Sequence, residues 1–443
     1  MYKRLIFFII LTIFAGLSFA QDNTGINTVK SISLEEALNL AVKNNVSIKR
    51  EKLLLDTAKR ASEHSWNSIL PSLSVSANDE VALPDIGKNK TETSLQNNFG
   101  VEGKISFSIP SDFFASMEKT KLDYEAAGIS FEQAVSEILL QVKETYFSLL
   151  LAKQNLDFAK ENLENTKNQA EQNEEQYKKG TLSELEYLSS KVAYEKLKPD
   201  LKAQELEFKN AIKNFCLFLG LEDNEITLDG SLEDFTNQYQ SFFDEDRIKA
   251  LGESLKNGNI PSIKYINKQI EAAEKNLKLT KLSAYGPNAN LSYSLNPILS
   301  TNEGGRIKHS ASLGLSIPLE NLLSFSKGAD SIKAAESAVK DLQLQLSEKS
   351  KSADADFAHI VQSLNQKEEN IDSLKAFVNL TQSNYETSKF AYSKGMTEFL
   401  SLQNASKENL EAKLNLQNEY LENLKLYISL EKLCGIQCQS KED

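Results

Sequence analysis

The chain has 443 residues, of which 18 are glycine and 8 are proline, and so few helix-breaking residues favour long helices with few turns. Its formal net charge of −12 argues against a nucleic-acid partner, because nucleic acids attract basic surfaces. A solvated acidic surface or an acidic lumen fits this charge better.

The first predicted element is a secretory signal peptide at residues 1–20. Lys3 and Arg4 precede a continuous apolar run that ends in Ser-Phe-Ala, so cleavage is expected before Gln21. No cysteine follows that site, and an N-terminal lipid anchor is therefore not expected. No later segment has the roughly 18 consecutive apolar residues that a transmembrane helix needs. We expect an exported protein.

The remaining chain contains two copies of one sequence repeat. The spacing from Gly180 to Gly395 equals the spacing from Gly220 to Gly435, and Tyr177 matches Tyr392 at the same offset. A repeat of this size indicates two copies of one structural unit. Each unit is predicted to contain a helix, a β-hairpin, a long helix, a turn and a return helix.

The predicted boundaries follow this plan. Repeat 1 spans residues 21–221, with a β-hairpin at 71–110, a long helix at 112–178 and a return helix at 184–219. Repeat 2 spans residues 260–436, with a β-hairpin at 287–318, a long helix at 320–393 and a return helix at 398–434. A connecting segment at 222–259 joins them, and residues 437–443 form a C-terminal tail.

Both long helices carry apolar residues at every seventh position, which is typical of coiled-coil packing. At about 1.5 Å per residue, each would be on the order of 100 Å long. Pro199 is expected to kink or break the first return helix. The seam residues are Val135, Val142, Leu149, Leu156, Leu163, Ala170 and Tyr177, with Ile138, Ala152 and Ala159 between them, and Phe357, Leu364, Ile371, Val378, Tyr385 and Tyr392.

The two hairpins alternate apolar and polar residues, as strands with one apolar face do. Phe99, Val101, Ile105 and Phe107 show this pattern in the first hairpin. It is typical both of a half-buried soluble sheet and of membrane-spanning strands. Four strands cannot close a barrel, and lipid does not tolerate an open edge, so a membrane-inserted sheet would require several copies of the chain.

The polar residues do not indicate an enzyme. The sequence lacks the phosphate-binding loop, the His-Glu-x-x-His zinc motif and the Gly-x-Ser-x-Gly nucleophile motif. His64, His309 and His359 show no ligand spacing. Cys434 and Cys438 lie one helical turn apart, near the distance limit for a disulfide, so free thiols are favoured. We expect no catalytic residues, no bound metal and no cofactor.

These features resemble the TolC-like outer-membrane efflux proteins. The resemblance covers almost the whole mature chain, and it depends on the duplicated plan, on Leu70-Pro and Gly286-Pro before the hairpins, and on Ser-Ile-Pro from Ser108 and Ser316 after them. It implies a mainly α fold with a transmembrane β-barrel contribution. A homotrimer would form one α/β barrel, with its strands in the outer membrane and its helices projecting into the periplasm.

The resemblance also implies a function and partners. The chain would be the exit duct of a tripartite efflux or type I secretion system. It would receive solutes from an inner-membrane efflux pump or ABC transporter through a periplasmic adaptor (membrane fusion) protein. The connecting segment would form part of an equatorial belt. The alternative is an exported coiled-coil adhesin or surface structural protein with a soluble β cap.

Gly180 and Gly395 are predicted to form the turns at the periplasmic tips, because glycine ends a helix in the left-handed conformation at little cost. The resemblance places the channel gate and the adaptor contact near these turns. The candidate adaptor contacts are Leu182, Leu185, Leu188, Phe399, Leu400 and Leu402.

The gate positions match the family only in part. Glu186 matches the acid that follows the first glycine, and Tyr392 matches the tyrosine before the second. A tyrosine hydroxyl donating to a carboxylate would bias a closed state. Thr397, Ser401 and Asn404 replace the family's charged residues, so the resemblance implies a constriction without that charged ring.

Overall fold

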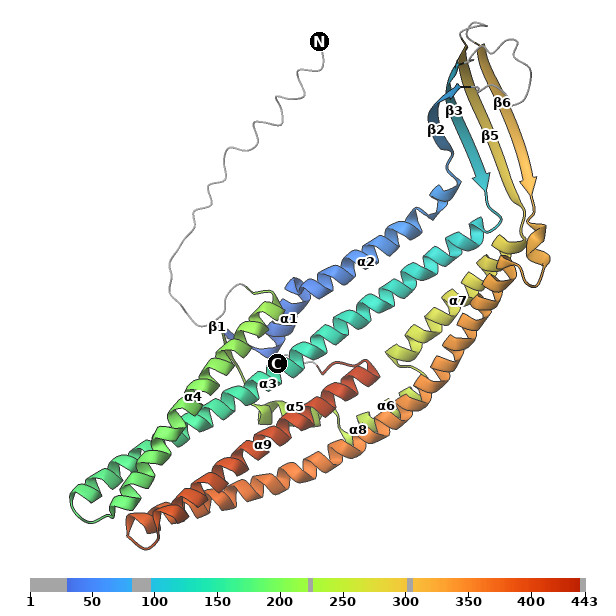
Figure 1. Ribbon diagram of the computed structural model, residues 1–443. Helices are drawn as coiled ribbons and strands as arrows, with labels where there is room; N and C mark the ends of the chain where they lie inside the picture. Colours follow the sequence, from blue (N-terminus) through green and yellow to red (C-terminus); the bar gives the residue numbers. More distant parts are fainter. Residues whose placement is uncertain (1–29, 82–96, 222–225, 301–305, 439–443) are drawn as a thin grey trace.

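The computed structural model describes residues 30–81, 97–221, 226–300 and 306–438, and it shows an elongated, mostly helical molecule (Figure 1). A four-stranded sheet lies at one end, and the two turns that connect α3 (Phe113–Lys178) to α4 (Glu184–Leu219) and α8 (Lys327–Ser393) to α9 (Phe399–Cys434) lie at the other. The expected signal peptide at 1–20 and most of the expected tail at 437–443 lie outside the described residues.

The helices and strands follow a similar order in the two halves of the chain, but the second half has one more α-helix before its two long strands, and its 3-10 helix comes after them. The first half contains β1 (Lys30–Ile32), α1 (Leu34–Asn44), α2 (Val46–Glu63), the 3-10 helix η1 (Ser65–Ile69), β2 (Ser72–Val81), β3 (Asn97–Ile109), α3 (Phe113–Lys178) and α4 (Glu184–Leu219). The second half contains β4 (Ile226–Leu228), α5 (Leu232–Phe242), α6 (Glu245–Lys256), α7 (Pro261–Tyr285), β5 (Asn288–Ser300), β6 (Arg306–Ser316), the 3-10 helix η2 (Leu319–Leu322), α8 (Lys327–Ser393) and α9 (Phe399–Cys434).

The long helices α3 and α8 organise the molecule, with 66 and 67 residues. α2 and α4 both pack along α3, and α7 and α9 both pack along α8 (Figure 1). α8 begins at Lys327, not at residue 320, because η2 intervenes and the Ser326 side chain caps the helix by accepting from Ala329 N.

α4 continues through Pro199 without interruption, so a break at this proline is wrong. Proline removes one backbone donor and crowds the preceding turn, which disfavours a helix interior. The other backbone hydrogen bonds of this 36-residue helix and its packing along α3 outweigh that local cost.

The sheet is antiparallel in the order β2-β3-β5-β6. Its register places Leu73 opposite Ile105, Ile105 opposite Tyr293, and Tyr293 opposite Ala311. Because residues directly opposite each other share a face, these apolar side chains line one side of the sheet. The other side carries serines, and their hydroxyls pair between strands at 2.6 Å (Ser72–Ser106), 2.7 Å (Ser292–Ser312) and 2.8 Å (Ser294–Ser310).

The main hydrophobic core lies midway along the helices, where the connecting segment forms β4, α5 and α6. Tyr146 of α3, Phe215 of α4 and Tyr239 of α5 are buried there. β1 pairs in parallel with β4, a contact that no periodic pattern predicted because each strand has only three residues. In the described chain, no helix is both long enough and apolar enough to span a membrane.

Candidate functional site

The two turns at the end of the helices share one backbone geometry. Gly180 has a φ of 75° and Gly395 a φ of 71°. Gly180 N donates to Tyr177 O and Gly395 N donates to Tyr392 O, both at 2.9 Å. A Cβ at either glycine would meet no atom within 4 Å, so only the left-handed backbone requires glycine here.

Glu186 belongs to a helix cap beside the first turn. Its backbone N donates to Ser183 Oγ at 3.2 Å, and Ser183 Oγ donates to Glu186 Oε2 at 3.2 Å. This reciprocal arrangement satisfies an otherwise unpaired amide at the start of α4. Within this chain the expected Tyr392–Glu186 hydrogen bond does not form, and the Glu186 carboxylate accepts from Ser183.

Tyr392 instead donates its hydroxyl to Asn173 Oδ1 at 3.0 Å, and both residues are buried. Gln169 Nε2 also donates to Asn173 Oδ1, at 2.9 Å. Burial chiefly raises the pKa of Tyr392, and the negative charge of Glu186 adds to that effect. The tyrosine hydroxyl is therefore a neutral donor. It joins α8 to α3, where the α8–α9 pair contacts the α3–α4 pair.

Sequence reasoning missed Asn173. It stands on the same heptad position as Ile138, Ala152 and Ala159 of α3, which makes it a polar residue on an apolar seam. A polar side chain at such a position specifies a partner across the interface, and this was the available signal.

An apolar cluster surrounds the Tyr392 ring. Phe399 and Leu402 of α9 are buried against it, and the ring centroids of Tyr392 and Phe399 are 5.9 Å apart. These two residues were expected to contact an adaptor from an exposed surface, and their burial removes them from that role. They pack the second tip internally because α9 turns back against α8 directly after Gly395.

The other candidate contacts lie at the surface. Leu185 is 76 % exposed, Leu400 is 61 % exposed, and Leu188 is also exposed, while Leu182 is half-buried. Met396, in the second turn, is exposed as well and was not singled out in the sequence. Apolar side chains therefore remain accessible beside both turns.

The three uncharged gate positions are not brought together by any contact in the described chain. Thr397 is half-buried in the second turn, and Ser401 and Asn404 are exposed on the first turns of α9. A separate contact stiffens the first tip, where the rings of Tyr177 and Tyr187 stack with centroids 5.1 Å apart. Aromatic packing therefore reinforces each turn.

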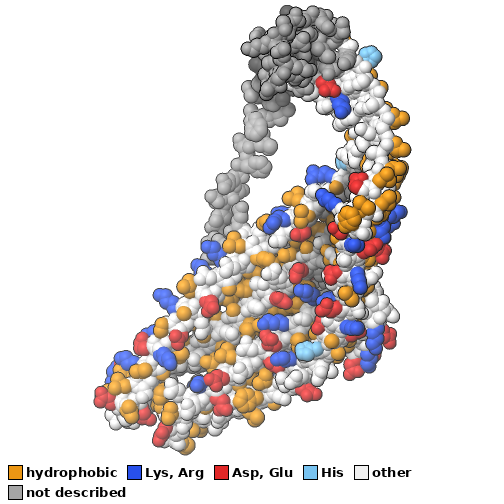
Figure 2. Space-filling view, turned by 45° about the vertical axis from the view of Figure 1, so that its right-hand side comes forward, with side chains coloured by type: hydrophobic (Ala, Val, Ile, Leu, Met, Phe, Trp, Pro, Cys, Tyr) orange, Lys and Arg blue, Asp and Glu red, His pale blue; other side chains and the backbone are white. Residues whose placement is uncertain are grey.

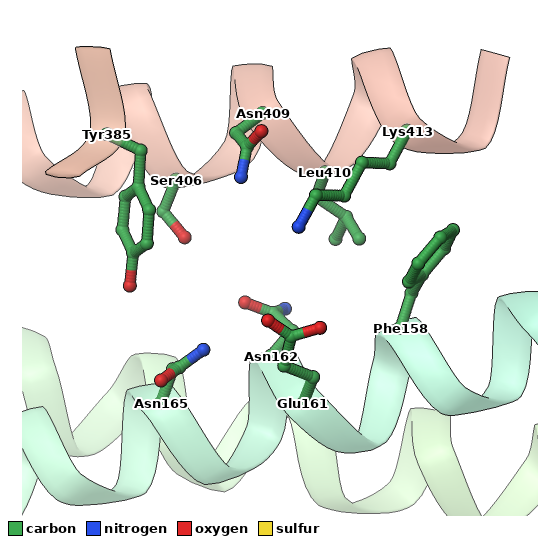
Figure 3. Close-up of a pocket in the computed structure, with 9 residues that line it drawn as sticks. All are labelled: Phe158, Glu161, Asn162, Asn165, Tyr385, Ser406, Asn409, Leu410 and Lys413. Carbon is green, nitrogen blue, oxygen red and sulfur yellow. The ribbon is translucent and has the colours of Figure 1, made fainter. Parts of the chain in front are cut away.

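A polar pocket lies above the tips, between α3 and α9 (Figure 3). Tyr385 of α8 points into it, and the pKa of Tyr385 is raised by burial and then by the charge of Glu161. Lys413 Nζ lies 5.9 Å from the ring centroid of Phe158 across the pocket. The remaining lining residues are mostly amides and hydroxyls: Asn162, Asn165, Ser406, Asn409 and Leu410.

The contacts among α3, α8 and α9 around this pocket are thus more polar than the heptad pattern indicated. Asn409 is buried, and its Nδ2 donates to Gln382 Oε1 at 2.8 Å. The described residues contain no group of three or more histidines, cysteines or acids that could hold a metal ion. As far as the structure describes the chain, this site consists of contacts between helices.

Comparison with known proteins relates this architecture to a family. Residues 37–214 match the family model described as outer membrane efflux protein. No curated protein sequence matches the chain significantly.

Several solved structures share the fold. The CmeC outer membrane channel of Campylobacter jejuni aligns with a TM-score of 0.72 at 18 % identity, covering 93 % of this chain and 87 % of that chain. CusC aligns with a TM-score of 0.70 at 15 % identity, covering 91 % and 92 %. The outer membrane protein VceC of Vibrio cholerae aligns with a TM-score of 0.67 at 14 % identity, covering 92 % and 97 %. The family match and this shared fold confirm that the chain resembles the TolC-like outer-membrane efflux proteins.

Proposed function

We propose that this chain is the outer-membrane exit duct of a tripartite efflux or type I secretion system. The observation that carries the proposal is the sheet, which leaves its apolar face uncovered. Leu73, Leu291, Leu313 and Leu315 are all exposed on that face. A sheet in water buries its apolar face against a second layer, whereas lipid would cover this one and leave the serine face toward an aqueous lumen.

The sheet edges support a homotrimer. β2 and β6 are the edge strands, and no further strand pairs with them among the described residues. Unpaired backbone groups are costly in lipid, so β6 of one copy would pair with β2 of the next. Three copies close a barrel wide enough for solutes to pass.

The helices would then continue the duct into the periplasm. Both turns lie at the end of the molecule opposite the sheet (Figure 1), where an adaptor linked to an inner-membrane pump or ABC transporter would dock. Leu185 and Leu188 of α4 and Leu400 of α9 supply exposed apolar side chains there. We assign the adaptor contact to these residues, with Leu182 at its margin.

The closed state would be held by the hydrogen bond from Tyr392 to Asn173. This bond joins α8 to α3 and therefore couples the two turns of one chain. A buried neutral bond of this kind contributes about 0.5–1.5 kcal/mol, enough to bias a conformational equilibrium in each of three subunits. Thr397, Ser401 and Asn404 add no charge, so opening would not depend on breaking ion pairs at those positions.

The test is membrane extraction of the mature protein followed by electrophoresis with and without heating. We expect retention in the outer membrane after carbonate treatment, a heat-dissociable trimer on the gel, and discrete conductance steps after reconstitution in planar bilayers. A monomer that carbonate releases, without conductance, would refute the duct and favour the coiled-coil adhesin.

A further inference from the structure

The segment between the sheet and α8 exposes large apolar side chains. We define the junction segment as residues 319–327, which includes η2 and the first residue of α8. Leu319, Leu322, Leu323 and Phe325 are each between 50 % and 79 % exposed. Four such side chains within seven residues, outside any described core, call for a covering environment.

The junction segment holds this exposed arrangement through its own polar groups. Asn321 Nδ2 donates to Ala284 O of α7 at 2.8 Å, and Ser326 Oγ donates to Asn321 O at 3.3 Å. Gly328 allows Asn321 to approach, because a Cβ there would lie 2.5 Å from the Asn321 side chain. Asn321 and Ser326 are half-buried and fix the turn, while Glu320, Ser324, the leucines and Phe325 are exposed.

The exposed side chains continue the apolar face of the sheet. Leu313 and Leu315 of β6 lie on that face, and Ile317 and Leu319, which follow the strand at the same two-residue spacing in the sequence, are also exposed. Figure 2 shows hydrophobic side chains along the strands and at the boundary between sheet and helices. The junction segment therefore begins directly after β6, at the end of the sheet's apolar face.

The junction segment ends in an exposed lysine, Lys327. Lys327 is exposed at the start of α8, and within the described chain it forms no ion pair. Aliphatic and aromatic side chains beside a free lysine are typical of elements that lie in the boundary between acyl chains and anionic headgroups.

We propose that the junction segment is an interfacial lipid anchor that sets the depth of the protein in the outer membrane. Leu319, Leu322, Leu323 and Phe325 enter the acyl–headgroup boundary of the periplasmic leaflet, and Lys327 contacts its phosphates. This inference depends on the proposed insertion of the sheet into the membrane. It adds a second contact with the membrane, parallel to the membrane surface, at the end of the strands.

The chain has a single tryptophan, Trp66, so fluorescence can report the anchor directly. In a Trp66→Phe background, tryptophan would be placed at Leu322 in the junction segment, at Leu313 on the sheet, or at Val192 on α4. All three positions are exposed, so none of these substitutions disturbs a core. Each full-length variant would be reconstituted in vesicles of phosphatidylcholine and phosphatidylglycerol with brominated acyl chains.

We expect bromine to reduce the emission of Leu322→Trp and Leu313→Trp at least about twofold, with Leu322→Trp most sensitive to bromine near the headgroups. Val192→Trp should respond only to aqueous acrylamide. If Leu313→Trp is quenched by bromine but Leu322→Trp responds to acrylamide alone, the proposal of a lipid anchor is wrong, whereas the proposed function as a duct is unaffected.

Two other outcomes separate the remaining possibilities. If Leu322→Trp is shielded from both bromine and acrylamide, a second copy covers the junction segment, and the lipid anchor is refuted. If neither Leu322→Trp nor Leu313→Trp is quenched by bromine, the sheet does not insert into the membrane, and both the lipid anchor and the proposed function are refuted.

Discussion

We expect the buried ion pair between Lys143 of α3 and Glu431 of α9 to be a strong structural link in the middle of the molecule. Lys143 Nζ lies 2.8 Å from both carboxylate oxygens, and the two side chains are 2 % and 0 % exposed. Glu431 also accepts from the Cys438 amide and, at 3.4 Å, from the Tyr239 hydroxyl of α5. The pair thus connects both halves of the chain to the connecting segment.

Lys143→Met leaves the Glu431 carboxylate buried with only those two weaker donors. Removing one partner of a buried pair costs about 3–5 kcal/mol of unfolding free energy, because the remaining charge is uncompensated. In Lys143→Met/Glu431→Leu no charge remains, so most of that loss should be recovered. The matched control is Lys425→Met on α9, whose ion pair with Glu422 is exposed and should contribute at most about 1 kcal/mol.

The effect should depend on pH. Burial raises the pKa of Glu431, and Lys143 opposes that shift, so Lys143→Met raises the pKa further. A carboxyl group whose pKa is higher in the folded state binds protons more tightly there, and stability increases as the pH falls through that pKa toward the unfolded value. The defect of Lys143→Met should therefore shrink at acidic pH.

The assay is denaturant unfolding of the purified protein in detergent, followed by helical circular dichroism at neutral and acidic pH. Equal stability of Lys143→Met and the parent protein would refute the reasoning, since a buried carboxylate cannot lose its cation without cost. A double variant no more stable than Lys143→Met would also contradict it, because the loss would then come from packing.

Further predictions concern the tips. Tyr392→Phe removes about 0.5–1.5 kcal/mol per chain from the closed state and should raise single-channel conductance, whereas Tyr177→Phe, which keeps its ring stack, should not; equal conductance of Tyr392→Phe and the parent channel argues against the gate. Gly395→Ala forces a left-handed alanine at a cost of about 1–2 kcal/mol and should lower the unfolding temperature; unchanged stability would mean that the turn relaxes. Leu185→Ser with Leu400→Ser should abolish export without changing the trimer on a gel; loss of the trimer instead would place these leucines in the assembly.

The candidate site could be predicted only in part. The turn glycines stand out because each interrupts a heptad pattern, and both have the left-handed backbone that such a position requires. The partner of Tyr392 could not be predicted, because Asn173 lies 219 positions away and the choice between it and Glu186 depends on how α3 and α8 align. The burial of Phe399 and Leu402 could not be predicted either, since an apolar residue at a tip can face either solvent or the neighbouring helix.

The sequence by itself determined what is local and periodic: the mainly helical composition, the apolar seams, the alternating strands and the two glycine turns. These features follow from backbone sterics and from the fixed periods of helix and strand, which neighbouring residues encode. Only the tertiary structure decided the short β1–β4 pair, the continuous helix through Pro199, the Lys143–Glu431 pair and the outward-facing junction segment. Each depends on packing between segments distant in the chain, where many weak contacts outweigh a local preference.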